Sequence, residues 1–195
     1  MLLASFFVSF LTAALVAPLV IRWYREHNWL DDPATHTHAK VVHDRPVPRG
    51  GGLVVLAGLM VGALIFLQWD QYLIAIMLGA VLIAVVGWLD DLYDLHPGIR
   101  LVTGSVAALV VILSGIGIGY VSNPFGEGVI HLDIWQWQYW FLGQPRSIWI
   151  LADLFALFFI LWNMNIVNWS KGVDGQLPAF VTISFLFVSL LAGKF

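Results

Sequence analysis

Three groups of polar residues in this sequence could carry out chemistry, and the first is acidic. The segment Asp90-Asp91-Leu92-Tyr93-Asp94 follows a long apolar stretch and contains three carboxylates. If a helix continues for one turn through Asp94, these side chains point within an arc of about 100°. Because carboxylates so close together repel, the pattern predicts a site for a hard divalent cation such as Mg²⁺, which could also bind a diphosphate. The alternative is a solvated helix end that stops the apolar stretch.

The second group is a basic loop that leads into another apolar stretch. The segment from His43 to Arg49 contains two prolines and is followed by three glycines. The prolines fix φ and hold Arg45 and Arg49 on an extended segment. The glycines let the backbone approach a ligand, and the helix start that follows them favours anions. His43, Arg45 and Arg49 are therefore expected to bind phosphate, unless the loop is only a rigid, positively charged anchor at the membrane surface.

The third group comes at the end of a later apolar stretch. Asn165 and Asn168 are three residues apart and share one helical face, and a turn containing Lys171 and Asp174 follows them. Amides inside a membrane helix often hydrogen-bond a neighbouring helix. Two of them beside such a turn favour a polar cavity whose donors bind phosphate or the edge of a nucleobase.

The composition indicates what kind of fold must position these groups. The 195 residues are 60% hydrophobic and only 11% charged, with a mean hydropathy of +0.86. An ordinary soluble domain has about 25% charged residues, so lipid is the expected solvent and the soluble globular class is excluded. The net charge of −3 provides no basic field for nucleic acid. The absence of cysteine excludes disulfides, thiolate metal sites and cysteine nucleophiles.

Six apolar stretches approach the length needed to cross a membrane, which is about 20 residues for a helix. We therefore predict an all-α, polytopic membrane bundle of about six helices, forming one domain over residues 1–195. The first stretch has neither a basic leader nor a small-residue cleavage site, which favours a retained helix over a signal peptide. The expected spans are Met1–Ile21, Leu53–Gln68, Gln71–Leu89, Leu101–Val121, Ile148–Val167 and Pro178–Leu191.

The distribution of cations predicts the orientation of this bundle. Seven of the nine Lys and Arg residues lie in the connections after the first, third and fifth stretches. The positive-inside rule places these odd-numbered connections in the cytoplasm and the N-terminus outside. All three polar groups lie in these connections, so we expect them to close over one cytoplasmic site. The seven cations are Arg22, Arg25, Lys40, Arg45, Arg49, Arg100 and Lys171.

The external stretch from Ser122 to Ser147 carries a weaker signal. Apolar and polar residues alternate from Ile130 to Ile134. This alternation fits a short hairpin on the membrane and fits an amphipathic interfacial loop equally well.

Together these segments resemble the polyprenyl-phosphate N-acetylhexosamine-1-phosphate transferases, of the glycosyltransferase family 4 type. The family pattern Asp-x-Pro, then His-x-x-Pro-x-Pro-Arg-x-Gly-Gly, matches residues 31–33 and 43–51. The pattern Asp-Asp-x-x-Asp-Leu, followed by a basic residue, matches residues 90–95 and Arg100. A third pattern, Asn-x-x-Asn-x-x-Asp-Gly-x-Asp-Gly-Leu, aligns with residues 165–177. Any one pattern is weak, whereas three in this order are typical of the family.

The resemblance implies transfer of a sugar-1-phosphate from a UDP-sugar to undecaprenyl or another polyprenyl phosphate, with release of UMP, to start a cell-envelope glycan. It implies Mg²⁺ as the cofactor, with Mn²⁺ as a substitute, and a multi-pass protein of the plasma membrane whose site faces the cytoplasm. The expected partners are the UDP-sugar, the polyprenyl phosphate and membrane lipid, and not nucleic acid. A second copy of the chain or a separate C-terminal portion is the expected protein partner.

The resemblance also implies roles for individual residues. Asp90 and Asp91 would be catalytic, holding the metal ion and the lipid phosphate. Asn168 would lie against the nucleotide diphosphate and Asp174 near the nucleobase, while the His and Arg residues of the basic loop mostly order that loop and its phosphate contacts. The implied substrate-binding residues are His43, Arg45, Arg49, Asp94, Arg100, Asn165, Asn168, Lys171 and Asp174.

The chain departs from the family pattern at two places. Lys171 stands where the family has an aspartate, which removes a metal ligand there, although a lysine can contact phosphate. Gln176 shifts the terminal leucine of the pattern by one position. The resemblance covers the N-terminal part of the family fold, so we expect the chain to be that part of a larger fold.

Two other functions are weighed against transfer. One is a truncated or non-catalytic membrane subunit that binds phosphate ligands without turnover. The other is an intramembrane prenyltransferase, which is disfavoured because the position four residues after Asp94, where that class would carry a further acid, is Gly98. Transport is the least favoured, because the polar groups gather at one face and not at mid-membrane.

Overall fold

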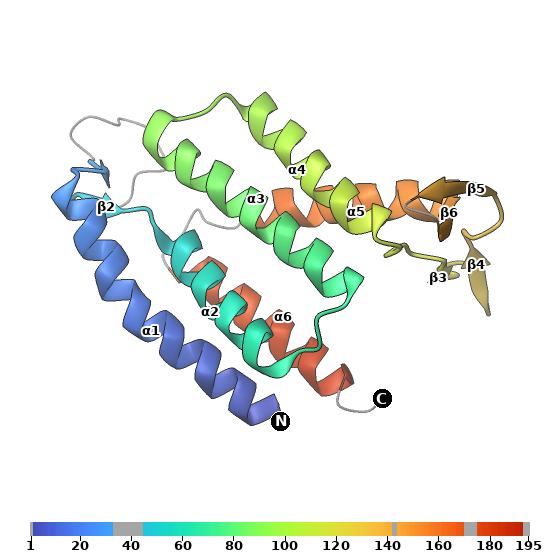
Figure 1. Cartoon of the computed structure of the whole chain (residues 1–195), viewed down its shortest axis with the longest axis horizontal. Helices are drawn as coiled ribbons and strands as arrows, with labels where there is room; N and C mark the ends of the chain where they lie inside the picture. The colour runs from blue at the N-terminus through green and yellow to red at the C-terminus, as the bar shows by residue number, and fades with distance from the viewer. Residues whose placement is uncertain (1, 33–44, 142–143, 170–174, 193–195) are drawn as a thin grey trace.

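The structure is a computed structural model that describes residues 2–32, 45–141, 144–169 and 175–192. Within these ranges the chain forms six helices and three small two-stranded hairpins (Figure 1). The predicted all-α membrane fold is confirmed. The helices are α1 (Leu2–Glu26), α2 (Gly51–Phe66), α3 (Gln71–Tyr93), α4 (Pro97–Leu113), α5 (Ile150–Trp169) and α6 (Gln176–Ala192). The strands are β1 (Leu30–Asp31), β2 (Val47–Pro48), β3 (Tyr120–Ser122), β4 (Val129–His131), β5 (Gln136–Phe141) and β6 (Gln144–Trp149).

Helix length and composition agree with a membrane setting. Among the described residues, α1, α3 and α5 are long and apolar enough to cross a membrane. The other three are apolar helices of 16 or 17 residues, at or just below the lower limit of about 17 for a span. Helix α1 runs to Glu26 and α3 to Tyr93, beyond the expected ends at Ile21 and Leu89. Arg22, Arg25, Asp90 and Asp91 are therefore helical, whereas Asp94 lies just past the end of α3.

The fourth span differs most from its expected bounds. It was expected over Leu101–Val121, but α4 begins at Pro97 and ends at Leu113. Proline is well suited to the first turn of a helix, which explains the earlier start. Glycines alternate with isoleucines after Ser114, and Gly115 has φ +104°. Repeated glycine weakens a helix, and a positive φ ends it.

Two hairpins form in and beside the stretch that was expected to be external, where the alternation allowed for one. Strand β4 lies in the alternating segment and pairs antiparallel with β3, with Val121 opposite Ile130, so a hairpin forms here. Strand β3 includes Tyr120 and Val121, which were expected in the fourth span. The second hairpin, β5–β6, pairs Trp137 with Ile148 and leads directly into α5. This second hairpin was not expected.

Small residues let the helices pack closely. A Cβ added to Gly58 of α2 would lie 2.9 Å from the backbone oxygen of Ser9 in α1. A Cβ on Gly79 of α3 would lie 3.4 Å from the backbone oxygen of Ala107 in α4. Such small-residue contacts are how membrane helices gain packing where burial from water contributes little.

Replacing Gly58 by alanine is expected to destabilise the protein. The new methyl group would meet backbone that cannot move without separating α1 from α2, and overpacking of this kind costs about 1–3 kcal/mol. Gly87→Ala, in α3, is the matched control, because its Cβ would meet nothing within 4 Å. Thermal unfolding in detergent should show a lower Tm for Gly58→Ala and an unchanged or higher Tm for Gly87→Ala. Equal melting temperatures for the two variants would contradict the close α1–α2 packing.

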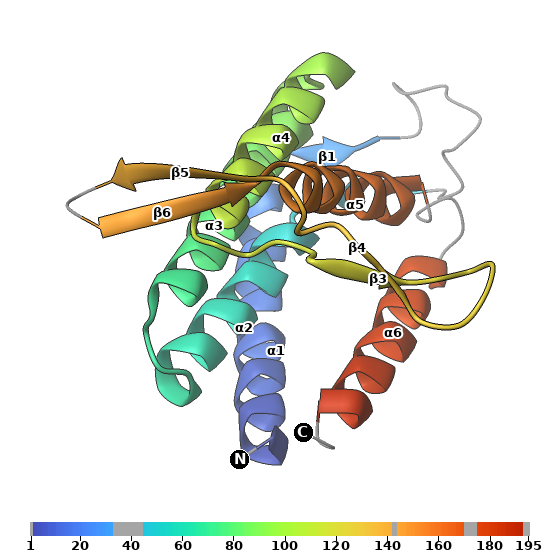
Figure 2. The same ribbon diagram turned by 90° about the vertical axis from the view of Figure 1, so that its right-hand side faces the viewer.

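The helices do not form one parallel stack. Figure 2 shows α5 lying at a steep angle to α1 and α2, and α6 standing apart from α1 and α2. No residue of α6 is buried among the described residues. The positioning framework for the polar groups is therefore built from α1 to α5.

Candidate functional site

Asp90 lies in the last turn of α3 and faces the first turn of α4. Its Oδ2 is 3.2 Å from Nη1 of Arg100, with the two side chains 19% and 39% exposed, respectively. Its other oxygen, Oδ1, is buried and accepts no hydrogen bond from the described residues. A buried acceptor without a donor is costly. Asp90 thus has one oxygen held by a cation and one available to a cation or donor that a ligand brings.

Asp91, the next residue of α3, faces α1. The hydroxyl of Tyr24 lies 3.5 Å from Asp91 Oδ2, at the long limit of a hydrogen bond. The Tyr24 side chain is completely buried, at 0% exposure. A buried ring that contacts a site carboxylate fixes the distance between the ends of α1 and α3.

Asp94 does not continue the acidic face of the helix. Helix α3 ends at Tyr93, and Asp94 adopts the left-handed conformation with φ 49° and ψ 61°. Its backbone N–H donates to the carbonyl oxygen of Asp90 at 2.9 Å, which closes the helix end. The expectation that the helix continues through Asp94 is therefore wrong, because Asp94 caps the helix and its side chain is exposed.

Three tryptophans join α1 and β1 to the same end of α3. The Trp23 and Trp88 rings stack with centroids 5.9 Å apart, and Trp29 lies 5.1 Å from Trp23 and 6.0 Å from Trp88. Aromatic pairs at these distances are attractive beyond their burial. This cluster holds the start of the first connection against the acidic segment.

The far end of the first connection is held by an ion pair. Arg49 Nη2 is 2.7 Å from Asp31 Oδ2, and β1 pairs antiparallel with β2 so that Asp31 lies opposite Val47. The expected extended segment is confirmed by β2. Arg49 therefore orders the base of the loop here. Arg45 is exposed, and His43 lies outside the described residues.

The amides of the third group lie at the end of α5. Asn165 Nδ2 donates to the carbonyl oxygen of Leu161 at 2.8 Å, within its own helix, while Asn168 is exposed. Lys171 and Asp174 lie outside the described residues. The structure thus leaves Asn168 as the amide of this helix face that is open to a ligand.

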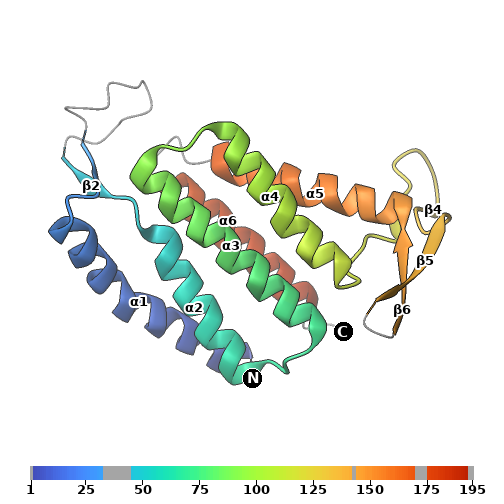
Figure 3. The same cartoon turned by 45° about the horizontal axis from the view of Figure 1, so that its top comes forward.

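Helices α4 and α5 bring this end close to Arg100. A Cβ on Gly104 of α4 would lie 3.0 Å from Cε of Met164 and 3.5 Å from Cδ2 of Leu161. Arg100 is one turn before Gly104, and Asn168 is one turn after Met164, so both follow from an antiparallel contact. Figure 3 shows the end of α5 beside the start of α4. The described residues of all three polar groups, among them Arg49, Asp90 and Asn168, therefore lie at the same end of the helices.

The residues at this end fit a metal ion shared with a ligand better than a closed protein site. Among the described residues, no group of three or more His, Asp or Glu side chains could hold a metal ion. Mg²⁺ commonly takes one or two carboxylates and completes its shell with water and substrate phosphates. Asp90 Oδ1, buried and without a hydrogen-bond donor, and the neighbouring Asp91 match that donor set.

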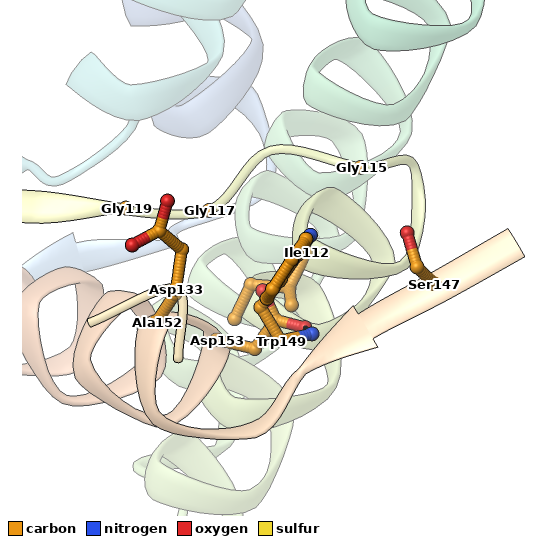
Figure 4. A pocket seen from close by; sticks show the side chains of 9 residues that line it. All are labelled: Ile112, Gly115, Gly117, Gly119, Asp133, Ser147, Trp149, Ala152 and Asp153. Carbon is orange, nitrogen blue, oxygen red and sulfur yellow. Dashed lines mark hydrogen bonds between the residues drawn. The ribbon is translucent and has the colours of Figure 1, made fainter. Parts of the chain in front are cut away.

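A separate polar pocket lies at the other end of α4. It has a volume of about 250 Å³ and is lined by Asp133, Ser147 and Asp153 together with three glycines of the segment after α4 (Figure 4). Asp153 Oδ2 accepts a hydrogen bond of 3.1 Å from the backbone N–H of Trp149, so the carboxylate holds the start of α5. Ile112 of this pocket is twelve residues from Arg100 along α4, which is about 18 Å. The pocket is therefore distinct from the acidic segment.

Sequence reasoning did not identify Tyr24 and Trp88 as parts of the site. Both lie near the ends of apolar stretches, where aromatic residues are expected in any membrane protein. The ring of Tyr24 is packed against Gly50, whose added Cβ would lie 2.6 Å from Tyr24 Cε2. The one signal in the sequence for this contact was the run of glycines from Gly50 to Gly52. Such a run indicates that another group packs closely against the backbone, but it does not indicate which residue that is.

Comparisons with known proteins agree with the motifs. Residues 73–194 match the family model described as glycosyl transferase family 4. A probable undecaprenyl-phosphate N-acetylglucosaminyl 1-phosphate transferase of Bacillus subtilis (strain 168) is 26% identical over 192 residues, covering 98% of this chain and 48% of that protein. A phospho-N-acetylmuramoyl-pentapeptide-transferase of Wolbachia sp. subsp. Drosophila simulans is 25% identical over 202 residues, covering 98% of this chain and 59% of that protein.

An archaeal relative extends this pattern. A putative UDP-N-acetylglucosamine--dolichyl-phosphate N-acetylglucosaminephosphotransferase of Saccharolobus solfataricus is 26% identical over 161 residues, covering 80% of this chain and 46% of that protein. The chain thus spans about half the length of the curated relatives it matches. No solved structure matches the chain.

Proposed function

Because this chain belongs to glycosyl transferase family 4, we propose that it acts in the transfer of a sugar-1-phosphate from a UDP-sugar to a polyprenyl phosphate, with release of UMP. An N-acetylhexosamine-1-phosphate and undecaprenyl phosphate are the favoured substrates. The names of the Bacillus and Saccharolobus relatives, which combine N-acetylglucosamine, phosphate and a lipid phosphate, support this choice. The step would start the assembly of a cell-envelope glycan on its lipid carrier.

The observation that supports this proposal most directly is the arrangement of the two oxygens of Asp90. One oxygen is held by Arg100, and the other is buried without a hydrogen-bond donor, inside the region that matches the family. A site that receives a cation together with a phosphate ligand would use this second oxygen.

The chemistry requires two anionic substrates to meet. The reaction joins the lipid phosphate to the β-phosphorus of the UDP-sugar and breaks the bond between that phosphorus and the oxygen that leaves with UMP. Mg²⁺ held by Asp90 and Asp91 would neutralise charge on the phosphoryl group. Arg100 orients Asp90, and Asn168 and Arg45 supply donors to phosphate oxygens, so the protein acts by positioning and electrostatics.

Release of UMP tests the proposed reaction. Membranes or detergent preparations that contain the chain are expected to release UMP from a UDP-N-acetylhexosamine only when undecaprenyl phosphate and Mg²⁺ are both present. UMP release that does not need the lipid would indicate hydrolysis and contradict transfer. Binding of the UDP-sugar without UMP release, even with the C-terminal half of a relative supplied, would support the phosphate-binding subunit instead.

The proposed cytoplasmic position of the site predicts how single cysteines are labelled. The sequence has no cysteine, so each introduced thiol is unique. Tyr93 is 71% exposed at the end of α3, and Phe125 is 95% exposed between β3 and β4. In intact cells an impermeant maleimide should label Phe125→Cys, and it should label Tyr93→Cys only after the membrane is permeabilised. Labelling of both from one side would overturn the orientation.

A further inference from the structure

A second cavity, unlike the pocket between α4 and α5, lies between the end of α1 and the start of α2. Its volume is about 390 Å³, and its walls are almost entirely apolar. Helix α1 contributes Ala17, Val20 and Ile21, and α2 contributes Val54. The cavity has room for part of one hydrocarbon chain and not for a whole lipid.

Arg25 gives this cavity its charge. Among the described residues that line the cavity, Arg25 alone is charged, and it forms no ion pair within the described part of the chain. Arg22, three residues earlier on the same helix, is bound to Glu26 by an ion pair of 2.7 Å. Because α2 begins at this cavity with Gly51, the positive end of its dipole adds to the field of Arg25.

The cavity is separate from the acidic segment. Tyr24 does not line it, yet its ring packs against Gly50 and its hydroxyl lies 3.5 Å from Asp91. This completely buried ring therefore fills the space between Gly50, a wall of the cavity, and the carboxylate. A lipid phosphate beside Arg25 would not reach Asp91 while Tyr24 holds this position.

The membrane setting indicates what occupies the cavity. Ile21, one turn before Arg25 on the same face of α1, lines the cavity and is 38% exposed, so apolar surface that hydrocarbon can contact leads up to the cation. An apolar slot with a cation at its rim, at the end of a spanning helix, complements a lipid with an anionic head, and such basic pockets between helices bind anionic headgroups. We propose that this cavity binds an anionic glycerophospholipid of the bilayer, with its phosphate at Arg25 and the adjoining part of one acyl chain against α1 and α2.

Thermal unfolding of the whole chain in a neutral detergent tests this site without relying on transferase activity. Added phosphatidylglycerol is expected to raise the Tm of the wild type and of Arg22→Gln equally, and to raise that of Arg25→Gln by less than half as much. Phosphatidylcholine should raise none of them. Equal loss of the response in the two arginine variants would show only a general attraction of cations to anionic lipid and would overturn the site.

A second pair of variants fills the cavity without removing charge. Gly51 lines the cavity and Gly52 does not, and a Cβ on either would meet nothing within 4 Å. Gly51→Leu should therefore abolish the response to phosphatidylglycerol, whereas Gly52→Leu should keep it. An unchanged response in Gly51→Leu would contradict binding in the cavity. Displacement of phosphatidylglycerol by an equimolar amount of undecaprenyl phosphate would identify the acceptor lipid as the occupant and overturn the assignment to a bilayer phospholipid.

Discussion

Asp90→Asn is expected to reduce lipid-dependent UMP release at least about 100-fold, the effect of removing one preorganised charge-stabilising group. Asparagine keeps the size of the side chain and an oxygen that faces Arg100, so the contact between α3 and α4 survives. It loses the negative charge that would hold the cation through the buried Oδ1. The measurement is the initial rate of UMP release at saturating substrates, repeated over a range of Mg²⁺ concentrations.

The Mg²⁺ series distinguishes two roles for Asp90, which are to hold the cation and to orient Arg100. If Oδ1 holds the cation, high Mg²⁺ should restore part of the activity of Asp90→Asn. If Asp90 only orients Arg100, then Arg100→Gln should be equally impaired and Mg²⁺ should restore neither. Asp70→Asn is the matched control: Asp70 caps the start of the same helix by accepting from the N–H of Leu73 at 2.7 Å, and asparagine caps about as well. Full activity of Asp90→Asn would exclude the carboxylate from the reaction.

The apolar spans were the most predictable part of this fold, because a membrane demands long runs of apolar residues. Five of the six helices begin and end within a few residues of the expected bounds, although the small shifts at Glu26 and Tyr93 decide which polar groups are helical. The predicted end of the fourth span was wrong, because the isoleucines after Ser114 keep the hydropathy high while the glycines, beginning with Gly115, end the helix. The hydropathy of a segment indicates whether it lies in lipid or in water. Whether the segment is helical depends on the helix propensity of its residues, which hydropathy does not measure.

The sequence was enough to predict which charged residues and amides belong to the candidate site. It was not enough to predict which of them contact one another. The family pattern contains both Asp90 and Arg100, and the structure places their side chains 3.2 Å apart. The sequence does not indicate that Arg49 is bound to Asp31, because the seventeen residues between them do not define how β1 and β2 pair. Tyr24 was not predictable at all, since its contact with Asp91 spans 67 positions.

Tyr24→Ala is expected to destabilise the protein by about 3–5 kcal/mol, the usual cost of removing a buried aromatic ring. The ring is 0% exposed, lies 5.9 Å from Trp23 and 5.7 Å from Trp29 between centroids, and packs against Gly50. Its loss would free both ends of the first connection from α3. Thermal unfolding in detergent should show a large fall in Tm, with a parallel loss of UMP release.

Tyr24→Phe separates the hydroxyl from the ring. The phenylalanine ring keeps the packing, so Tm should change little, while the loss of one hydroxyl contact to Asp91, about 1 kcal/mol, should lower kcat about fivefold. Because the hydroxyl acts through Asp91 as a positioning group, the Mg²⁺ concentration for half-maximal activity should rise while the KM for the UDP-sugar stays the same. Tyr93→Phe, the same change at an exposed position of α3, should alter neither quantity. A normal Mg²⁺ requirement in Tyr24→Phe would reduce Tyr24 to a packing residue, and the link between α1 and the acidic segment would then rest on the tryptophan cluster alone.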